Sequence, residues 1–264
     1  MSTIKEFHRE SIDNPDAFWA EEAKLIDWHR PFTKTLDFSR PPFAKWFVDG
    51  ETNLCFNAVD RHAAKRPNDR AMVFISTETN TEIVYSFSDL KKEVMRTAAI
   101  MQSLGVGKGD RVLIYMPMIP EATFAMLACA RIGAVHSVVF GGFAPGSLAT
   151  RIDDATPKLI VSADAGMRGG KAVPYKHLLD DAIVLATHKP AKVLMINRGL
   201  DPESNSVEGR DVDYATLREQ FIDAEVPITW LESSEPSYIL YTSGTTGKPK
   251  GVQRDTGGYA VALA

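Results

Sequence analysis

The sequence predicts an α/β fold built on a parallel sheet. From about Asn53 onward, short apolar segments alternate with helical patterns, and the connections between them are short. Segments such as Val112–Tyr115 and Leu159–Val161 are continuously apolar, as expected when both faces of a strand are covered. Alternating strands and helices with short connections indicate right-handed βαβ units. The prediction of an α/β fold rests on this alternation together with the continuously apolar strands.

The first 50 residues differ from this pattern and begin with a predicted helix. Asn14 suits an N-cap, and Pro15 suits the first turn of a helix. We predict that this helix runs from Pro15 to about Trp28. It is expected to bury four apolar side chains: Phe18, Trp19, Leu25 and Ile26.

The segment His29–Gly50 combines prolines with aromatic residues and has no clear period. The residues concerned are Pro31, Phe32, Phe38, Pro41, Pro42, Phe43, Trp46 and Phe47. Disordered tails are poor in aromatic residues, so a disordered tail is disfavoured. We predict an extended strap that its rings hold against a larger body.

The regular part of the chain starts with a helix over Asn53–Lys65, which ends because the residue before Pro67 avoids the helical region. A strand pair at Met72–Ser76 and Ile83–Phe87 follows, and then a helix from an N-cap at Ser88 to Leu104, closed by Gly105. Further strands are predicted at Arg111–Met116, Ala134–Phe140, Lys158–Ala163, Lys192–Asn197 and Ser237–Tyr241. Further helices are predicted at Pro120–Ile132, Pro145–Asp154, Pro174–Thr187 and Tyr214–Ala224, with a surface loop at Gly199–Arg210.

The composition excludes several classes of protein. The chain has 264 residues, 44% hydrophobic and 24% charged, which is ordinary for a globular protein. A net charge of −4 gives no reason to expect nucleic-acid binding. No apolar run approaches the roughly 20 residues that span a bilayer, and the N-terminus lacks the apolar core of a signal peptide. We expect a cytoplasmic protein without a membrane partner.

The two cysteines, Cys55 and Cys129, lie in apolar surroundings and form no CxxC spacing. We expect reduced core residues, and a single disulfide between them stays open as the alternative. The six histidines show no spacing typical of a zinc site. No metal site is therefore expected.

Four other ionisable residues are assigned no chemistry. His136 lies within an apolar strand and is expected to be a satisfied core histidine rather than a base. Glu121 follows Pro120 at a helix start, where a carboxylate offsets the helix dipole. The pair Asp153 and Asp154 at a helix end is expected to be solvated.

The most informative segment is Tyr241–Gly251, which is rich in glycine, hydroxyl and lysine residues. Glycines let successive backbone N–H groups turn toward one point and form an anion-binding nest. Hydroxyls add donors and lysines add positive charge, so the segment suits a polyphosphate. The residues that supply these groups are Thr242, Ser243, Gly244, Thr245, Thr246, Gly247, Lys248 and Lys250.

This segment is not a P-loop of the G-x-x-x-x-G-K-[ST] type. Only two residues separate Gly244 from Gly247, and Pro249 follows Lys248 where a magnesium-binding Ser or Thr would stand. A phosphate-loop hydrolase is thereby disfavoured. A generic polar surface loop is the alternative without function.

A second candidate site follows the predicted strand that ends at Ala163. Glycines open the backbone over the next residues, and Arg168 and Lys171 present positive charge three positions apart. Ligands of parallel sheets bind at the carboxyl ends of the strands, so this segment suits a phosphate group. The alternative is a solvated pair of loop cations.

The whole string Tyr241–Val252 resembles the signature loop of the adenylate-forming superfamily of acyl-CoA synthetases. Upstream, Tyr115–Ala122, Ala128–Phe143 and the N-terminal strap are similar to the acetyl- and propionyl-CoA synthetase branch. The residues after the loop, Gly251–Ala264, are closer to propionyl-CoA synthetases. The resemblance covers essentially the entire chain.

The resemblance implies both an architecture and an activity. Residues 1–52 correspond to the N-terminal helix and strap of that branch, and residues 53–264 to the first part of an AMP-binding domain. The remainder of that domain and the C-terminal domain are expected to be absent, so the chain is expected to be inactive alone. The implied reaction converts propionate, ATP and coenzyme A (CoA) to propionyl-CoA, AMP and diphosphate. An acetate ligase and a non-catalytic CoA- or nucleotide-binding module are the alternatives.

The resemblance also assigns ligands to residues. The positions from Thr242 to Lys248, with Lys250, would hold the ATP phosphates, and Mg²⁺ would accompany ATP. Gly142, Arg168 and Lys171 would contact CoA, although the family often has arginine where Lys171 stands, and lysine lacks the bidentate fork. No catalytic residue is expected within the chain. Apolar surface left uncovered would favour self-association.

Overall fold

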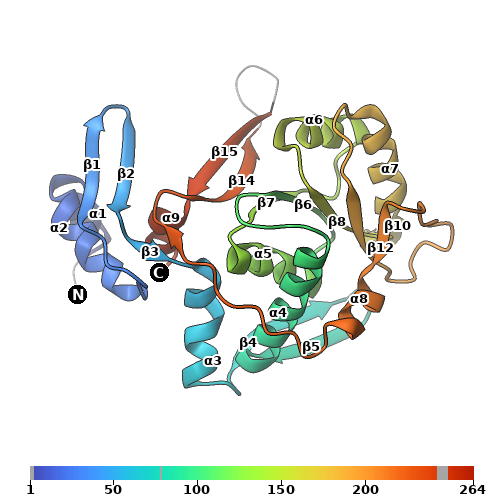
Figure 1. The fold of residues 1–264 in the computed structure, drawn as a ribbon, viewed down its shortest axis with the longest axis horizontal. Helices are drawn as coiled ribbons and strands as arrows, with labels where there is room; N and C mark the ends of the chain where they lie inside the picture. The colour runs from blue at the N-terminus through green and yellow to red at the C-terminus, as the bar shows by residue number, and fades with distance from the viewer. Residues whose placement is uncertain (1–2, 78, 243–248) are drawn as a thin grey trace.

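The computed structural model describes residues 3–77, 79–242 and 249–264, and within them a seven-stranded sheet forms the centre (Figure 1). The strand order is β12 (Asp211–Asp213), β11 (Lys192–Ile196), β8 (Leu159–Ala163), β6 (Arg111–Tyr115), β7 (Val135–Val139), β14 (Pro236–Thr242) and β15 (Lys250–Asp255). All neighbours are parallel except β14 and β15, which form an antiparallel pair. The predicted parallel α/β sheet is confirmed, and the antiparallel edge strand was not predicted.

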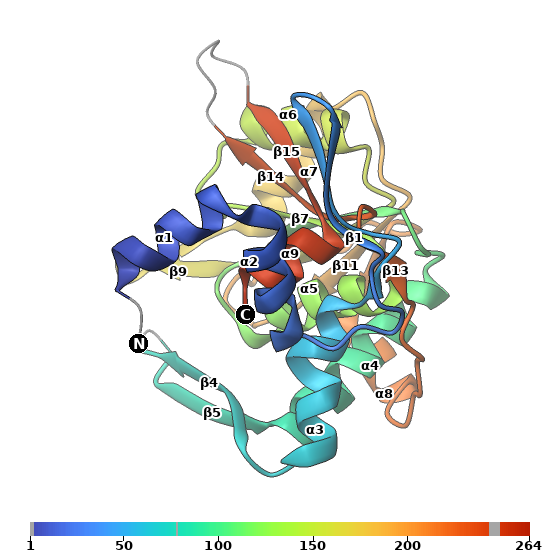
Figure 2. The ribbon, with the colours of Figure 1, turned by 90° about the vertical axis from the view of Figure 1, so that its left-hand side faces the viewer.

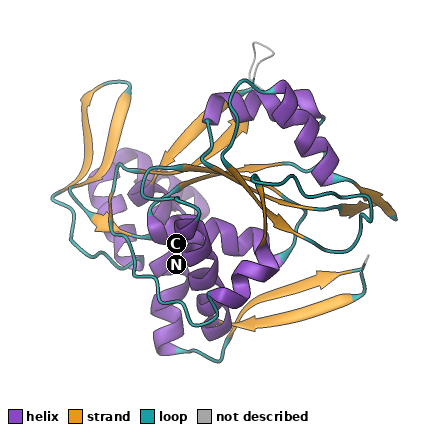
Figure 3. Ribbon diagram, turned by 45° about the vertical axis from the view of Figure 1, so that its right-hand side comes forward, coloured by secondary structure: helices purple, strands orange, loops and turns teal. Residues whose placement is uncertain are grey.

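Helices cover both faces of this sheet (Figures 1 and 3). The hydrophobic core on one face involves α4 (Phe87–Ser103), α5 (Pro120–Ile132) and α8 (Tyr214–Gln220), and the core on the other involves α6 (Pro145–Ala155) and α7 (Tyr175–Leu185). Strand β6 shows why its sequence is continuously apolar. Val112 and Ile114 belong to the first core, Leu113 and Tyr115 to the second, and all four are fully buried.

The N-terminal region differs from the prediction. An unpredicted helix, α1 (Ile4–Asp13), begins at a capping box between Thr3 and Glu6. The predicted helix α2 (Pro15–Glu22) ends before the short 3₁₀ turn η1 (Ala23–Leu25), so its extension to Trp28 is wrong. The predicted strap contains a β-hairpin of β1 (Lys34–Arg40) and β2 (Phe43–Val48), in which Pro41 and Pro42 connect the two antiparallel strands.

Aromatic packing nevertheless holds this region to the body, as predicted. Phe47 is buried with Ala260 and Val261 of α9 (Thr256–Ala262), and the rings of Trp28 and Phe32 lie 5.4 Å and 5.1 Å from it. Trp19 of α2 packs against the same cluster, and Figure 2 shows α2 in front of α9 in that view. The short pair of β3 (Glu51–Thr52) and β13 (Leu231–Glu232) adds a second attachment.

Not all aromatic and apolar side chains of this N-terminal region are buried. Ile26 is buried as predicted, and Phe18 and Trp19 are partly buried, whereas Leu25 is 53% exposed. Phe38 and Phe43, on the hairpin, are also exposed. The rings near α9 and the stacking of His29 on Trp230, with ring centres 4.4 Å apart, therefore help to hold the segment in place, whereas the exposed hairpin rings do not.

Several remaining element boundaries shift by a few residues. The π-helical turn η2 (Phe56–Asp60) and α3 (Arg61–Lys65) confirm the predicted helix, and β4 (Arg70–Ser76) and β5 (Thr81–Ser86) form the predicted strand pair. Helix α4 is capped by Ser86 and not by Ser88, since Asp89 stands at the third helical position and completes a capping box with Ser86. A small hairpin of β9 (Gly166–Arg168) and β10 (Lys171–Val173) was not predicted.

Cys55 and Cys129 are both buried free thiols, as expected, and no disulfide joins them. Burial raises the pKa of the Cys55 thiol to about 12 and also raises the pKa of Cys129. In the part of the chain that the structure describes, no helix is both long and apolar enough to cross a membrane.

Candidate functional site at the carboxyl edge of the sheet

A cavity of about 410 Å³ lies where β6, β7 and β8 end. The segments that follow each of these strands form its wall, together with the end of β4. The lining residues are Phe74, Ile75, Ser76, Thr77, Pro117, Met118, Ile119, Phe140, Gly141, Gly142, Met167, Arg168, Val173, Tyr175 and Arg198. The cavity therefore occupies the edge of a parallel sheet where ligands are expected to bind.

Glycines shape this cavity because the backbone passes close to large side chains. A Cβ atom on Gly141 would lie 1.8 Å from the Tyr175 hydroxyl oxygen, and one on Gly166 would lie 2.5 Å from the Tyr175 ring. A Cβ on Gly142 would lie 2.4 Å from the Phe140 ring and 3.0 Å from an Arg168 guanidinium nitrogen. Any side chain at these positions would displace the cavity wall.

The structure brings Gly142 and Arg168 together and places Lys171 next to them. Arg168 and Lys171 are directly paired across the β9–β10 hairpin, whose turn consists of two glycines with positive φ. The Arg168 guanidinium carbon lies 5.9 Å from the centre of the Phe140 ring. Both cations are exposed, and neither forms an ion pair with a described residue. Arg168 lines the cavity, whereas Lys171 lies outside its lining.

The predicted phosphate loop joins β14 to β15. Thr242 ends β14, Lys250 begins β15, and these two exposed residues face each other across the pair. The predicted site residues Ser243, Gly244, Thr245, Thr246, Gly247 and Lys248 lie outside the described residues. The structure thus fixes both ends of the loop at one edge of the sheet.

Helix α6 contacts the root of this loop. The Tyr241 hydroxyl donates a hydrogen bond of 2.6 Å to Asp154, and the Arg151 guanidinium carbon lies 5.4 Å from the Tyr241 ring. Burial and the Asp154 carboxylate raise the pKa of Tyr241, and burial lowers the pKa of Arg151. Asp154 is exposed, as expected for a solvated residue, whereas Asp153 is only partly exposed and accepts a 2.8 Å hydrogen bond from the backbone N–H of His188.

Arg151 was missed by sequence reasoning. Its guanidinium carbon lies 4.2 Å from the Phe143 ring, so it also contacts the glycine-rich segment after β7. An arginine in an amphipathic helix normally indicates a solvated position, and only the fold reveals that this side chain is buried. The sequence therefore carried no signal for it.

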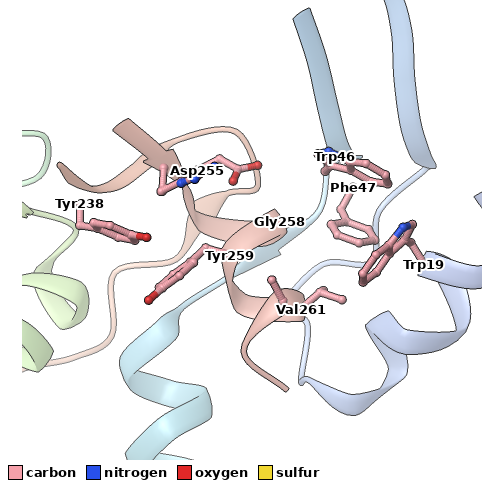
Figure 4. Close-up of a pocket in the computed structure, with 10 residues that line it drawn as sticks. Trp19, Trp46, Phe47, Tyr238, Asp255, Gly258, Tyr259 and Val261 are labelled. Atoms are coloured by element: carbon pink, nitrogen blue, oxygen red, sulfur yellow. The ribbon is translucent and has the colours of Figure 1, made fainter. Parts of the chain in front are cut away.

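A larger cavity, of about 470 Å³, lies between the N-terminal rings and α9 (Figure 4). Trp19, Trp46 and Phe47 line one side, and Tyr238 and Tyr259 the other. None of the predicted site residues that the structure describes lines it. Within residues 3–77, 79–242 and 249–264, no group of three or more His, Cys, Asp or Glu side chains could hold a metal ion.

His136 lies in β7 and stacks on Tyr238, with ring centres 5.7 Å apart. Its Nδ1 is buried and has no hydrogen-bond partner within the described part of the chain, so the expectation of a satisfied ring is wrong for that atom. Burial lowers the pKa of His136 to about 4. The ring is therefore neutral near pH 7.

This histidine predicts a pH dependence of stability. Between pH 6.5 and 4 the unfolded chain binds a proton on His136 that the folded chain does not, so the free energy of unfolding falls as the pH falls. His136→Phe keeps a ring against Tyr238 and cannot bind the proton. Urea unfolding at pH 6.5 and 5 should show that this variant loses less stability than the parent, by up to about 2 kcal/mol.

His8→Phe, on the exposed face of α1, is the matched control and should keep the parent pH dependence. Equal pH slopes for His136→Phe and the parent would show that the folded protein protonates this ring normally.

Comparison with known families agrees with this geometry. Residues 59–264 match the family described as AMP-binding enzyme. The chain belongs to this family. Residues 4–58 match the acetyl-coenzyme A synthetase N-terminus, the segment that contains α1, α2 and the β1–β2 hairpin.

Comparison with individual proteins shows which members of this family the chain resembles. The chain is 63% identical to a propionate--CoA ligase of Salmonella typhimurium over 262 residues, which is 99% of this chain and 42% of that protein. It is 46% identical to the rat mitochondrial acyl-CoA synthetase short-chain family member 3 over 96% of the chain and 37% of that protein. The fold matches acetoacetyl-CoA synthetase from Streptomyces lividans with a TM-score of 0.88 and 28% identity, over 99% of this chain and 40% of that one. The chain thus spans less than half the length of these relatives.

Proposed function

We propose that this chain is part of a short-chain acyl-CoA synthetase that acts on propionate. The reaction would join a carboxylate to CoA in two steps, through an acyl-adenylate, and release AMP and diphosphate. The observation that carries the proposal is the 63% identity to a propionate--CoA ligase over 99% of the chain. Residues 1–52 would form the N-terminal segment and residues 53–264 the first part of the adenylation domain, with the acyl pocket and C-terminal domain outside the chain.

The β14–β15 loop would hold ATP. The glycines within residues 242–248 allow backbone N–H groups to converge on the phosphates, the hydroxyls add donors, and Lys248 and Lys250 add positive charge. These groups would stabilise the negative charge on the phosphates while the carboxylate attacks the α-phosphorus. AMP would then be a far better leaving group than hydroxide when the CoA thiol attacks the adenylate.

CoA would bind at the carboxyl edge of the sheet. Arg168 and Lys171 are exposed cations without described carboxylate partners, so they are available for a phosphate group. Phe140 offers a half-exposed ring beside Arg168, and Gly142 lets a ligand approach the backbone. The cavity of about 410 Å³ has the size of a small-molecule site.

Mg²⁺ would enter as the ATP complex. Proteins commonly bind Mg²⁺ through one or two carboxylates together with substrate phosphates, so a dedicated cluster of acidic residues is not required. A cytoplasmic location and self-association through exposed apolar residues are further parts of this proposal. The exposed residues of the β4–β5 hairpin, with Ile75 66% and Val84 48% exposed, motivate the second of these.

The test uses the longer protein that carries this chain. With ATP, Mg²⁺ and CoA present, diphosphate release should require a short carboxylate, and kcat/KM should be higher for propionate than for acetate. A clear preference for acetate would replace propionate in the proposal. Release that no short carboxylate supports would reject the ligase.

Two further measurements on the same protein test two other candidate functions. The presence of Gly142, Arg168 and Lys171 on one edge favours a non-catalytic CoA-binding module as the second candidate. That candidate predicts heat on titration with CoA but no diphosphate release. Carboxylate-independent release of inorganic phosphate, lost in Lys248→Ala, would instead indicate a hydrolase.

A further inference from the structure

Helix α6 lies against both of the segments that the proposed function assigns to ligands. Arg151 is only 6% exposed, and its guanidinium lies against Phe143, which follows Gly141 and Gly142. The same guanidinium lies against Tyr241, which precedes Thr242. One side chain thus touches the CoA segment and the root of the ATP loop.

The orientation of Arg151 is well defined. Its Nη1 donates a 2.7 Å hydrogen bond to the Ser147 carbonyl one turn earlier, which points the side chain along the helix. It forms no ion pair within the described part of the chain. Its charge therefore interacts mainly with the two rings, and such contacts strengthen when they are removed from water.

Asp154 holds Tyr241 from a second direction. It stands three residues after Arg151 and hence on the same face of α6. Its carboxylate accepts the 2.6 Å hydrogen bond from the Tyr241 hydroxyl. A Cβ on Gly251, the strand partner of Tyr241, would lie 3.4 Å from the Asp154 carboxylate, so β15 also passes close to this contact.

We propose that Arg151 and Asp154 are positioning residues that couple the two ligand segments. They fix the ring and the hydroxyl of Tyr241, and with them the strand ends at Thr242 and Lys250, relative to Phe143. A misplaced loop would then slow the reaction with ATP. A displaced Arg151 would slow both the reaction with ATP and the reaction with CoA. The inference rests on the proposed function for the identity of the ligands, while the contact itself is independent of it.

The kinetic test uses variants of the longer protein. Asp154→Ala and Tyr241→Phe each remove one end of the same hydrogen bond, so each should lower kcat/KM for ATP about tenfold, as expected for one hydrogen bond to a charged group. The double variant should be no worse than either single variant. KM for CoA should stay unchanged in these variants, whereas Arg151→Met should raise it.

Asp153→Ala is the matched control, because it removes a neighbouring carboxylate on α6 whose hydrogen bond goes to His188 and not to Tyr241 of β14. It should leave kcat/KM for ATP at the parent value. Equal kinetics for Asp154→Ala and Asp153→Ala would overturn the proposal, as would independent, multiplying effects of Asp154→Ala and Tyr241→Phe.

A second measurement on the 264-residue chain needs no activity. Trypsin does not cut before proline, so the bond after Lys248 resists it, and cleavage after Lys250 requires the end of β15 to open. Asp154→Ala should speed this cleavage about tenfold if a hydrogen bond to a charged group holds the strand end. An unchanged rate would reject the positioning role even if the enzyme is active. An accelerated rate in a protein without ligase activity would reject only the proposed function.

Discussion

Replacing Arg168 by methionine is expected to raise KM for CoA by about 10- to 100-fold, the effect of losing a charged hydrogen-bonding group worth roughly 1.5–3 kcal/mol. Arg168 is exposed at the cavity edge, has no described carboxylate partner and lies over the Phe140 ring. Its loss should therefore remove a ligand contact without removing a contact that stabilises the fold. KM for ATP should not change.

The measurement is steady-state kinetics of the longer protein with CoA varied. Lys171→Met should have a smaller effect than Arg168→Met, since Lys171 lies outside the cavity lining and a lysine cannot form a bidentate contact. Lys65→Met, an exposed cation at the end of α3, is the control and should behave as the parent. A parent-like KM for CoA in Arg168→Met would remove this residue from the CoA site.

Replacing Arg131 by methionine is expected to lower the free energy of unfolding by about 3–5 kcal/mol, because it leaves a buried carboxylate without its main partner. The Arg131 side chain is 4% exposed and donates hydrogen bonds of 2.8 Å to Asp60 and 2.6 Å to the Val226 carbonyl. It thereby joins α5 to η2 and to the segment before β13. Lys91, 3.3 Å from Asp60, compensates only in part.

Urea unfolding of the chain measures this effect. Lys108→Met breaks a pair of similar length with Glu235, but that pair is exposed and should contribute less than about 1 kcal/mol. Arg131→Met combined with Asp60→Leu should recover much of the loss, since the buried charge is gone. Similar losses for Arg131→Met and Lys108→Met would mean that water reaches the buried pair.

The sequence predicted the central sheet because its signals are local. Continuous apolar runs such as Val112–Tyr115 require cover on both faces, and Pro120 at the start and Gly133 after the end delimit α5 at the predicted residues. Several short strands were not predicted, because whether such a segment forms a strand depends on the strand that it pairs with. Lys250–Asp255 has little apolar character and is a strand only because β14 lies beside it.

The candidate site was predicted in part for the same reason. Glycines and cations gathered in one segment, as at Arg168 and Lys171, are visible in the sequence. The contact of Arg151 with Tyr241 joins residues 90 positions apart, and no local pattern indicates it. Helix caps show the same limit, since both Ser86 and Ser88 suit the position and the side chain of Asp89 selects Ser86.

The most direct test of the proposed function is the product balance of the longer protein. With propionate, ATP and CoA, mass spectrometry should detect propionyl-CoA, AMP and diphosphate in equal amounts, since each adenylate formed yields one of each. Omission of CoA should still allow propionate-dependent exchange of labelled diphosphate into ATP. Formation of ADP and phosphate in place of AMP and diphosphate, or no propionyl-CoA at all, would contradict the assignment as an adenylate-forming propionate ligase.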